Sequence, residues 1–298
     1  MVKYIFVLSF FIVANFAPTY GQKSKVNNLL SWQDSLKKLS YQISQSQLEP
    51  ERYNANYTFI KTLVNALKTA YSFNFGFDSL KTIAITRSPD SKFRLFTWHV
   101  LNDDGSYRYY GAIQLNSTDG KLELLPLVDY TPGIKNATDT ITTNDKWYGA
   151  QYYKIIPVRE NGSKVFYMLL GWKGNTVKST KKLIEILSFE KEKAYFGKPV
   201  FDGSPDYVSK KRIIFEYNSK TAMMLRYLND QNLIIFDHLA PMNEKVIGKS
   251  EFYGPDLTYD GFRLVDGRCR FLSNLPLKNA PSDKDEQFID PKKKHLNK

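Results

Sequence analysis

The stretch 147–175 constrains the fold more than any other part of the 298-residue sequence. It holds two apolar runs on either side of Asn161-Gly162, and Asn-Gly between apolar runs predicts a tight β-hairpin because both residues tolerate a positive φ. The second run, 165–172, is apolar at odd and at even positions. A strand of this kind has no side left for solvent, so we expect layers of structure over both of its faces.

Residues 25–71 predict two helices that form an αα-hairpin. Apolar residues recur at intervals of three and four from Leu29 to Ile43 and again from Tyr53 to Tyr71, which is the period of one helix face. Pro50 suits the first turn of the second helix, where no backbone N–H bond is needed. We expect the apolar stripe to pack on the sheets that follow; an amphipathic helix that binds a membrane or a partner is the alternative.

From residue 73 onward the apolar period changes from 3.6 to 2, beginning with Phe73, Phe75 and Phe77, and this indicates extended structure. About thirteen short runs with tight turns between them predict a mainly β fold of antiparallel meanders. A propeller-like arrangement, a large sandwich and a barrel all remain open. Two long loops are expected at 130–146 and 240–257, and loops of that length are often functional or mobile.

Three Pro-Asp turns begin at Ser88, Ser204 and Gly254. The first continues into Ser91-Lys92 and resembles the Ser-Pro-Asp-Gly-Lys turn of TolB-type β-propeller repeats, with Ser91 where that motif has Gly. The turns are unevenly spaced, so no fixed repeat period emerges. The whole chain is similar to exported β-rich proteins of Bacteroidetes-type bacteria, and this resemblance implies export without implying an activity.

The N-terminus predicts a signal peptide that is cleaved before Gln22. Lys3 precedes an apolar run of about thirteen residues, which is short of the roughly twenty needed to span a bilayer, and small residues Thr19 and Gly21 suit the cleavage site. An uncleaved anchor is the alternative. The single cysteine, Cys269, allows no intramolecular disulfide, which favours a bacterial periplasmic or secreted protein over a secreted eukaryotic one.

The sequence predicts four segments. They are a signal peptide at 1–21, a helical segment packed on the sheet at 22–72, an all-β domain at 73–277 and a disordered tail of mixed charge at 278–298. We expect no transmembrane segment once the signal peptide is removed.

The formal net charge of +12 raises nucleic acid as a partner. Export argues against nucleic acid, so a solvated lysine-rich surface or an anionic envelope component is expected instead. The three histidines, His99, His238 and His295, do not share a metal-binding spacing with each other or with Cys269. No G-x-S-x-G turn is present either. We therefore expect no metal site and no cofactor.

Two classes of function stay open. The first is a non-catalytic exported β-protein that binds an envelope component, a glycan or a protein partner through loops and surface aromatics, with Tyr207, Tyr253 and Tyr259 as candidate binding residues. The second is a carbohydrate-active hydrolase, which needs two carboxylates held about 5 to 9.5 Å apart. Its candidate carboxylates lie in turns near those tyrosines: Asp202, Asp206, Asp256 and Asp260.

Overall fold

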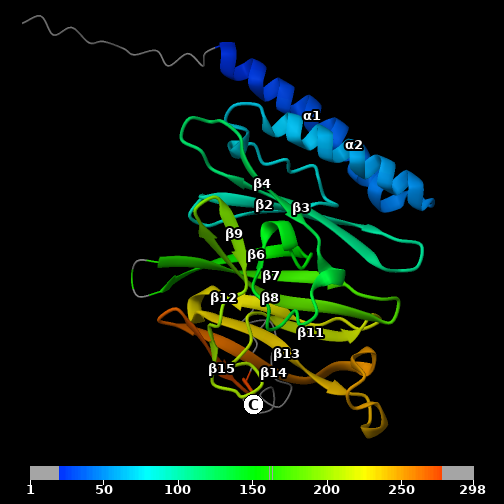
Figure 1. Ribbon diagram of the computed structural model, residues 1–298, viewed down its shortest axis with the longest axis vertical. Helices are drawn as coiled ribbons and strands as arrows, with labels where there is room; N and C mark the ends of the chain where they lie inside the picture. The colour runs from blue at the N-terminus through cyan, green and yellow to red at the C-terminus, as the bar shows by residue number, and fades with distance from the viewer. Residues whose placement is uncertain (1–19, 161, 163, 277–298) are drawn as a thin grey trace, which may run out of the picture.

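Within the residues that the structure describes, two α-helices and fifteen strands build four layers, with the helical layer at one end of a stack of three sheets (Figure 1). The structure, a computed structural model, describes residues 20–160, 162 and 164–276. Residues 1–19 of the expected signal peptide and the whole expected tail lie outside the described residues. Within the described part of the chain, no helix combines the length and the apolar character needed to cross a membrane.

The helical layer is the predicted αα-hairpin of α1 (Tyr20–Gln45) and α2 (Glu49–Leu67). Pro50 stands in the first turn of α2, as expected, and two glutamates of that turn lie at the positive end of the helix dipole. Leu36 and Phe59 are fully buried, and the Phe59 ring meets Trp98 of the first sheet edge-on at 5.1 Å. The apolar stripe therefore packs on the sheet.

Sheet 1 is an antiparallel meander that lies under the helices. Its strands pair in chain order: β1 (Ala84–Arg87), β2 (Phe93–Leu101), β3 (Tyr107–Leu115) and β4 (Glu123–Val128).

The expectation of extended structure at 73–77 is wrong. Ser72–Asn74 forms a turn of 3₁₀ helix, and the backbone that follows it joins no sheet. The reason is Arg94, a buried side chain of β2 that donates hydrogen bonds to the carbonyl oxygens of Ser72 and Phe75. Phe73 and Phe77 are buried beside this guanidinium. The alternating apolar pattern therefore reflects the burial of these rings and does not indicate a strand.

Sheet 2 is the middle layer and contains the predicted central hairpin. Gly162 has a φ of +77°, as the Asn-Gly turn requires. Met168 belongs to the core shared with sheet 3, whereas Leu169 belongs to the core shared with sheet 1, so the two-faced burial of this strand is confirmed. The strands are β5 (Thr142–Thr143), β6 (Gln151–Glu160), β7 (Lys164–Gly174), β8 (Ser179–Glu190), β9 (Lys193–Phe196) and β11 (Ile213–Asn218), in the order β5-β9-β8-β7-β6 with β11 also on β8.

Sheet 3 closes the other end of the stack. It shows that the loop expected at 240–257 is shorter, because Ala240 still pairs with Gly254 and the connection covers only 242–252. Its strands are β12 (Leu225–Leu228), β13 (Leu233–Pro241), β14 (Tyr253–Val265) and β15 (Arg268–Leu272), with the two-residue β10 (Phe201–Asp202) parallel to β15.

The mainly β, antiparallel fold class is thus confirmed, with two more strands than expected because β5 and β10 are two residues long. Successive meanders pack face to face, as neighbouring propeller blades do, but here they form a linear stack (Figure 1). The sandwich is therefore the closest of the three expected arrangements. Separate apolar cores fill the three interfaces between the four layers.

Candidate functional site

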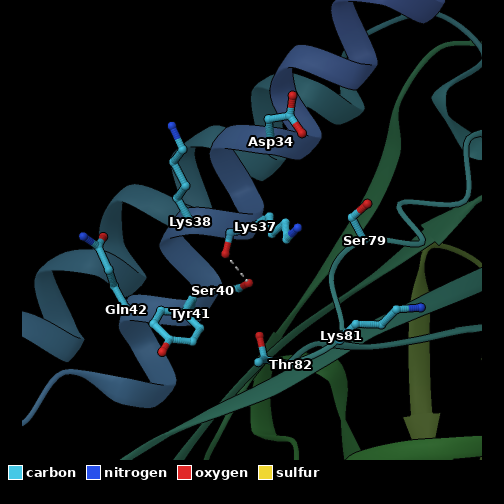
Figure 2. A pocket seen from close by; sticks show the side chains of 9 residues that line it. All are labelled: Asp34, Lys37, Lys38, Ser40, Tyr41, Gln42, Ser79, Lys81 and Thr82. Carbon is cyan, nitrogen blue, oxygen red and sulfur yellow. Dashed lines mark hydrogen bonds between the residues drawn. The ribbon is translucent and has the colours of Figure 1, made fainter.

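Cavities lie at several places on the molecule. One separates α1 from residues 79–82 (Figure 2), and another lies beside the hairpins β6–β7 and β8–β9. Two further cavities, of about 320 and 280 Å³, share the side chain of Tyr107 at the end of sheet 2 where β7 ends and β8 begins. We call these two together the Tyr107 groove. It is the candidate site because aromatic rings, hydroxyl groups and buried charges converge on it.

The first cavity of the groove combines three aromatic side chains with small polar ones. Tyr107, Trp172 and Tyr217 supply the rings, and Lys182 supplies one ammonium group. Hydroxyl groups come from five residues: Thr176, Ser179, Thr180, Ser219 and Thr221.

Strand register places these side chains on one face of sheet 2. Trp172 lies directly opposite Lys182 across β7 and β8, and Thr180 lies opposite Tyr217 across β8 and β11. Thr180 and Lys182 are two residues apart, so all four side chains point to the same face, the one that packs on sheet 3. Strand β12 begins only at Leu225, so this end of the face is left open.

A cluster of rings fixes the orientation of the aromatic wall. The imidazole of His99 lies 5.1 Å from the Tyr107 ring and 5.5 Å from the Trp172 ring, and the latter two meet edge-on at 5.7 Å. His99 Nδ1 lies 2.7 Å from Oε1 of Gln151, and this hydrogen bond orients the imidazole ring. Burial lowers the pKa of His99, although this hydrogen bond opposes the shift. A neutral imidazole therefore holds the two aromatic rings in place.

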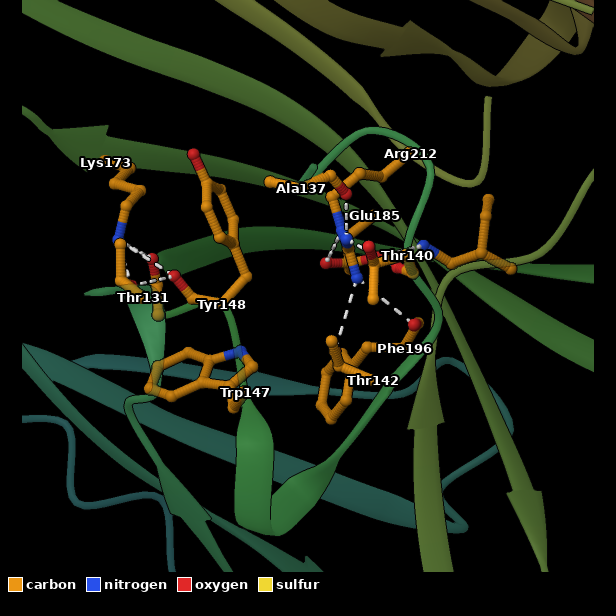
Figure 3. Close-up of polar contacts among 12 residues, drawn as sticks. Thr131, Ala137, Thr140, Thr142, Trp147, Tyr148, Lys173, Glu185, Phe196 and Arg212 are labelled. Carbon is orange, nitrogen blue, oxygen red and sulfur yellow. Dashed lines mark hydrogen bonds and ion pairs between the residues drawn. The ribbon is translucent and has the colours of Figure 1, made fainter. Parts of the chain in front are cut away.

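Lys173 lies under the second cavity and is almost fully buried. Its ammonium donates hydrogen bonds to Thr131 Oγ1 at 3.0 Å and to the carbonyl oxygens of Tyr148 at 2.8 Å and Gly149 at 2.7 Å (Figure 3). Burial lowers the pKa of Lys173 to about 7, and the nearby carboxylate of Asp129 opposes the shift. Lys173 thus connects the segment 131–149, whose Thr131 lines the groove, to the end of β7.

A second buried cation holds the same segment further along. Arg212 Nε donates to Glu185 Oε2 at 2.8 Å, and both side chains are fully buried. The guanidinium also donates to the carbonyl oxygens of Ala137 and Thr140 (Figure 3). Burial raises the pKa of Glu185, and Arg212 opposes that shift. The long loop expected at 130–146 is therefore held by Lys173 at its start and by Arg212 in its middle, and its Thr131 lines the groove.

The four expected carboxylates lie on sheet 3 and its turns. Asp202 forms an ion pair with Arg268 at 2.5 Å, and Asp206 is exposed in its turn. Asp260 is buried and lies 2.7 Å from Nδ1 of His238. The Asp256 carboxylate accepts a hydrogen bond from the backbone N–H of Thr258 at 3.0 Å.

The structure brings some of these carboxylates together and separates others. The register of β13 and β14 shifts between Asp237 and Leu239 and leaves residues 256–258 opposite His238, so Asp256 and Asp260 both lie near that imidazole. A hydrogen bond from Thr258 lowers the pKa of Asp256. Asp202 lies apart from them, in its ion pair on β10.

The three expected tyrosines have structural surroundings. The ring of Tyr207 packs 5.2 Å from Phe262 and 5.1 Å from Phe271, and burial, followed by Asp260 and Asp206, raises its pKa to about 12. The Tyr253 hydroxyl accepts a hydrogen bond from the backbone N–H of Gly248 at 3.0 Å, and Tyr259 is half-buried on β14. None of the seven expected site residues lines the Tyr107 groove.

The residues of the groove were missed because the central hairpin was interpreted only as core. One local signal was present in the sequence: Lys173 directly follows the apolar run 165–172, and a lysine that continues a buried strand needs polar partners for its charge. The sequence carries no comparable signal for Tyr107 or Tyr217. No family model, curated protein or solved structure matches this chain, so the groove is interpreted from its own chemistry.

Proposed function

We propose that this protein is an exported, non-catalytic binding protein that holds an oligosaccharide in the Tyr107 groove. The observation that carries the proposal is that three aromatic rings and five hydroxyl groups share one cavity. A pyranose ring offers an apolar C–H face that stacks on Tyr or Trp, and a rim of hydroxyls that exchange hydrogen bonds with Ser and Thr. The groove supplies oriented rings at Tyr107 and Trp172. Its Ser and Thr hydroxyls donate within the protein, for example Ser219 to Val177 O and Thr221 to Asn218 O, and they offer their oxygen lone pairs to the sugar as acceptors.

Binding fits the groove better than hydrolysis does. Glycoside hydrolysis needs two carboxylates on either side of the scissile bond. Asp129, the carboxylate on the groove wall, accepts hydrogen bonds from the backbone N–H groups of Tyr109 and Thr131, both at 2.9 Å. Nearby Glu216 pairs with Lys181 at 3.3 Å. Both carboxylates therefore hold neighbouring strands, and the turn carboxylates of the alternative hydrolase lie on sheet 3.

The exported location is a proposal from the sequence. It rests on the apolar N-terminal run, on the small residues before Gln22 and on the single cysteine. A periplasmic or secreted protein meets polysaccharides of the cell envelope, and these are the oligosaccharide source that we propose.

The experiment is a binding screen of the purified protein against immobilised neutral and acidic oligosaccharides, with Trp172→Ala and Tyr57→Ala as paired variants. Tyr57 is a matched control because it is an exposed aromatic on α2, in the helical layer, and lines neither cavity of the groove. We expect at least one oligosaccharide to bind the wild type and Tyr57→Ala equally well, and to bind Trp172→Ala at least about tenfold more weakly. Absence of binding across the screen contradicts the proposal.

A further inference from the structure

A cavity of about 700 Å³ lies between α1 and residues 79–82, in the helical layer and apart from the Tyr107 groove (Figure 2). We call it the α1 cavity. Lys37, Ser40 and Tyr41 face it from α1, and Ser79, Lys81 and Thr82 face it from the segment that leads into β1. Its volume is within the usual range for small-ligand pockets, about 300 to 1,000 Å³.

The inward side of α1 explains why a gap exists here. Gln33 and Ser40 are seven residues apart, so they lie on the same helix face, and both are buried although polar. Gln33 Oε1 accepts the backbone N–H of Ser79 at 3.3 Å, and the Ser40 hydroxyl donates to the carbonyl oxygen of Lys37 at 3.0 Å (Figure 2). Ser40 is small, so the helix face next to Thr82 is not filled.

The charges around the α1 cavity are unbalanced. Three lysines, Lys37, Lys38 and Lys81, line it with one carboxylate, Asp34, which gives a net charge of 3 − 1 = +2. None of these four groups forms an ion pair within the described part of the chain. A concave surface of one sign concentrates ligands of the opposite sign, so the cavity favours an anion.

The walls are apolar below these charges. Lysine side chains place aliphatic stems along a surface while their ammonium groups stay in water. The ring of Tyr41, which is 64% exposed, adds a flat apolar surface on α1. Lys37 extends from α1 toward Ser79 across the gap (Figure 2). A cationic rim above aliphatic and aromatic walls matches a ligand with an anionic end and an apolar end.

We propose that the α1 cavity binds single molecules of an anionic amphiphile, with a phosphate or carboxylate group at Lys37 and Lys81 and an alkyl chain against the lysine stems and Tyr41. This site is separate from the Tyr107 groove, and either can exist without the other.

The test uses dodecyl phosphate, below the concentration at which it forms micelles, titrated calorimetrically into the purified exported protein. We expect binding of one molecule per chain, and no binding of inorganic phosphate or of dodecyl maltoside, which lack the alkyl chain and the charge respectively. Reversing charges with Lys37→Glu/Lys81→Glu, and filling the cavity with Thr82→Trp, should each weaken binding at least about tenfold. All three positions are exposed, so these variants should keep the wild-type thermal stability.

Lys25→Glu is the matched control for the single charge reversal Lys37→Glu, since each changes the net charge by −2. Lys25 is exposed on the same helix, about 18 Å from Lys37 at 1.5 Å per residue, and does not line the cavity. Unchanged binding by Lys25→Glu supports the proposal. An equal loss of dodecyl phosphate binding in Lys25→Glu would overturn the proposal, because net charge alone would then attract the probe. Unchanged binding by Thr82→Trp, binding of inorganic phosphate as tight as that of dodecyl phosphate, or binding only to phosphatidylglycerol vesicles would each overturn the proposal.

Discussion

The ring of Tyr107 lies so close to Gly174 that a Cβ atom built on Gly174 would stand 2.4 Å from two carbons of that ring. No real contact of this kind is tolerated, so the absence of a side chain at Gly174 is what lets the ring cover the end of β7. Tyr107 is the residue that the two cavities of the groove share. The shape of the groove therefore depends on the absence of a side chain at Gly174.

Gly174→Ala should displace Tyr107 and damage the groove. We expect a loss of about 1 to 3 kcal/mol in unfolding free energy from overpacking, together with weaker oligosaccharide binding. Gly254→Ala is the control, because the nearest atom to a Cβ there is 3.7 Å away. Chemical denaturation and a binding titration on both variants check this. Wild-type binding by Gly174→Ala would show that Tyr107 can move without consequence.

Lys173 should make stability depend on pH above neutrality. Its pKa is about 7 in the folded protein and has the ordinary lysine value, about 10.4, in the unfolded chain. Between about pH 7 and 10.4 Lys173 is protonated in the unfolded chain and mostly neutral in the folded protein. Below pH 7 the folded protein must bury the charged ammonium, which lowers its stability. As pH rises above 7 the buried amine loses its proton, so the unfolding free energy increases. From pH 7 to 8.5 the unfolding free energy of the wild type should rise by about 1 to 2 kcal/mol relative to Lys173→Met.

Denaturation of both proteins at several pH values between 7 and 8.5 measures this difference. Burial raises the pKa of Cys269, so its thiol ionises in this pH range only in the unfolded chain. Because wild type and Lys173→Met both carry Cys269, its effect on stability is the same in both and drops out of the difference. Parallel curves would mean that Lys173 does not lose its proton in this range.

Arg212→Met should strongly destabilise the fold. It leaves the fully buried Glu185 without its partner and removes donors from the carbonyl oxygens of Ala137 and Thr140. We expect a loss of about 3 to 5 kcal/mol, measured by denaturation. The double variant Arg212→Met/Glu185→Leu should recover part of this loss because no unpaired carboxylate remains. A double variant less stable than Arg212→Met would contradict this explanation.

Gly162→Val should destabilise the protein through backbone conformation alone. The φ of Gly162 is +77°, and a Cβ at this position would meet nothing within 4 Å. The expected loss is about 1 kcal/mol or more, measured as a lower unfolding free energy. Gly254→Val is the control, since its φ is not positive and its surroundings are nearly as open. Equal stabilities of the two variants would show that the positive φ is not required.

Local patterns were enough to predict the helical hairpin and a central strand that is covered on both faces. The Asn161-Gly162 turn and the two apolar faces of β7 predicted a central strand, because period and turn chemistry act over a few residues. The helical stripe was predicted for the same reason. At 73–77 the apolar pattern was misleading, since Arg94, about twenty residues away in the chain, takes up the backbone carbonyl groups that a strand would use.

The groove could not be predicted in the same way. Tyr107, Trp172 and Tyr217 come from three separate strands, and only the pairing of β7 with β8 and of β8 with β11 brings the latter two to one face. Register between distant strands leaves no mark in a local window of sequence. The expected tyrosines, by contrast, were selected for lying near turn carboxylates, and Tyr207 packs in the core beside Phe262.

The most direct test of the proposed function is a calorimetric titration of Trp172→Ala, beside the wild type and Tyr57→Ala, with the oligosaccharide that binds best in the screen. Removing a stacking ring from the centre of a sugar site should weaken binding at least about tenfold, because such aromatic contacts dominate binding energy. Tyr57→Ala should bind as the wild type does. Binding by Trp172→Ala as tight as that of the wild type would show that the Tyr107 groove is not where the sugar sits.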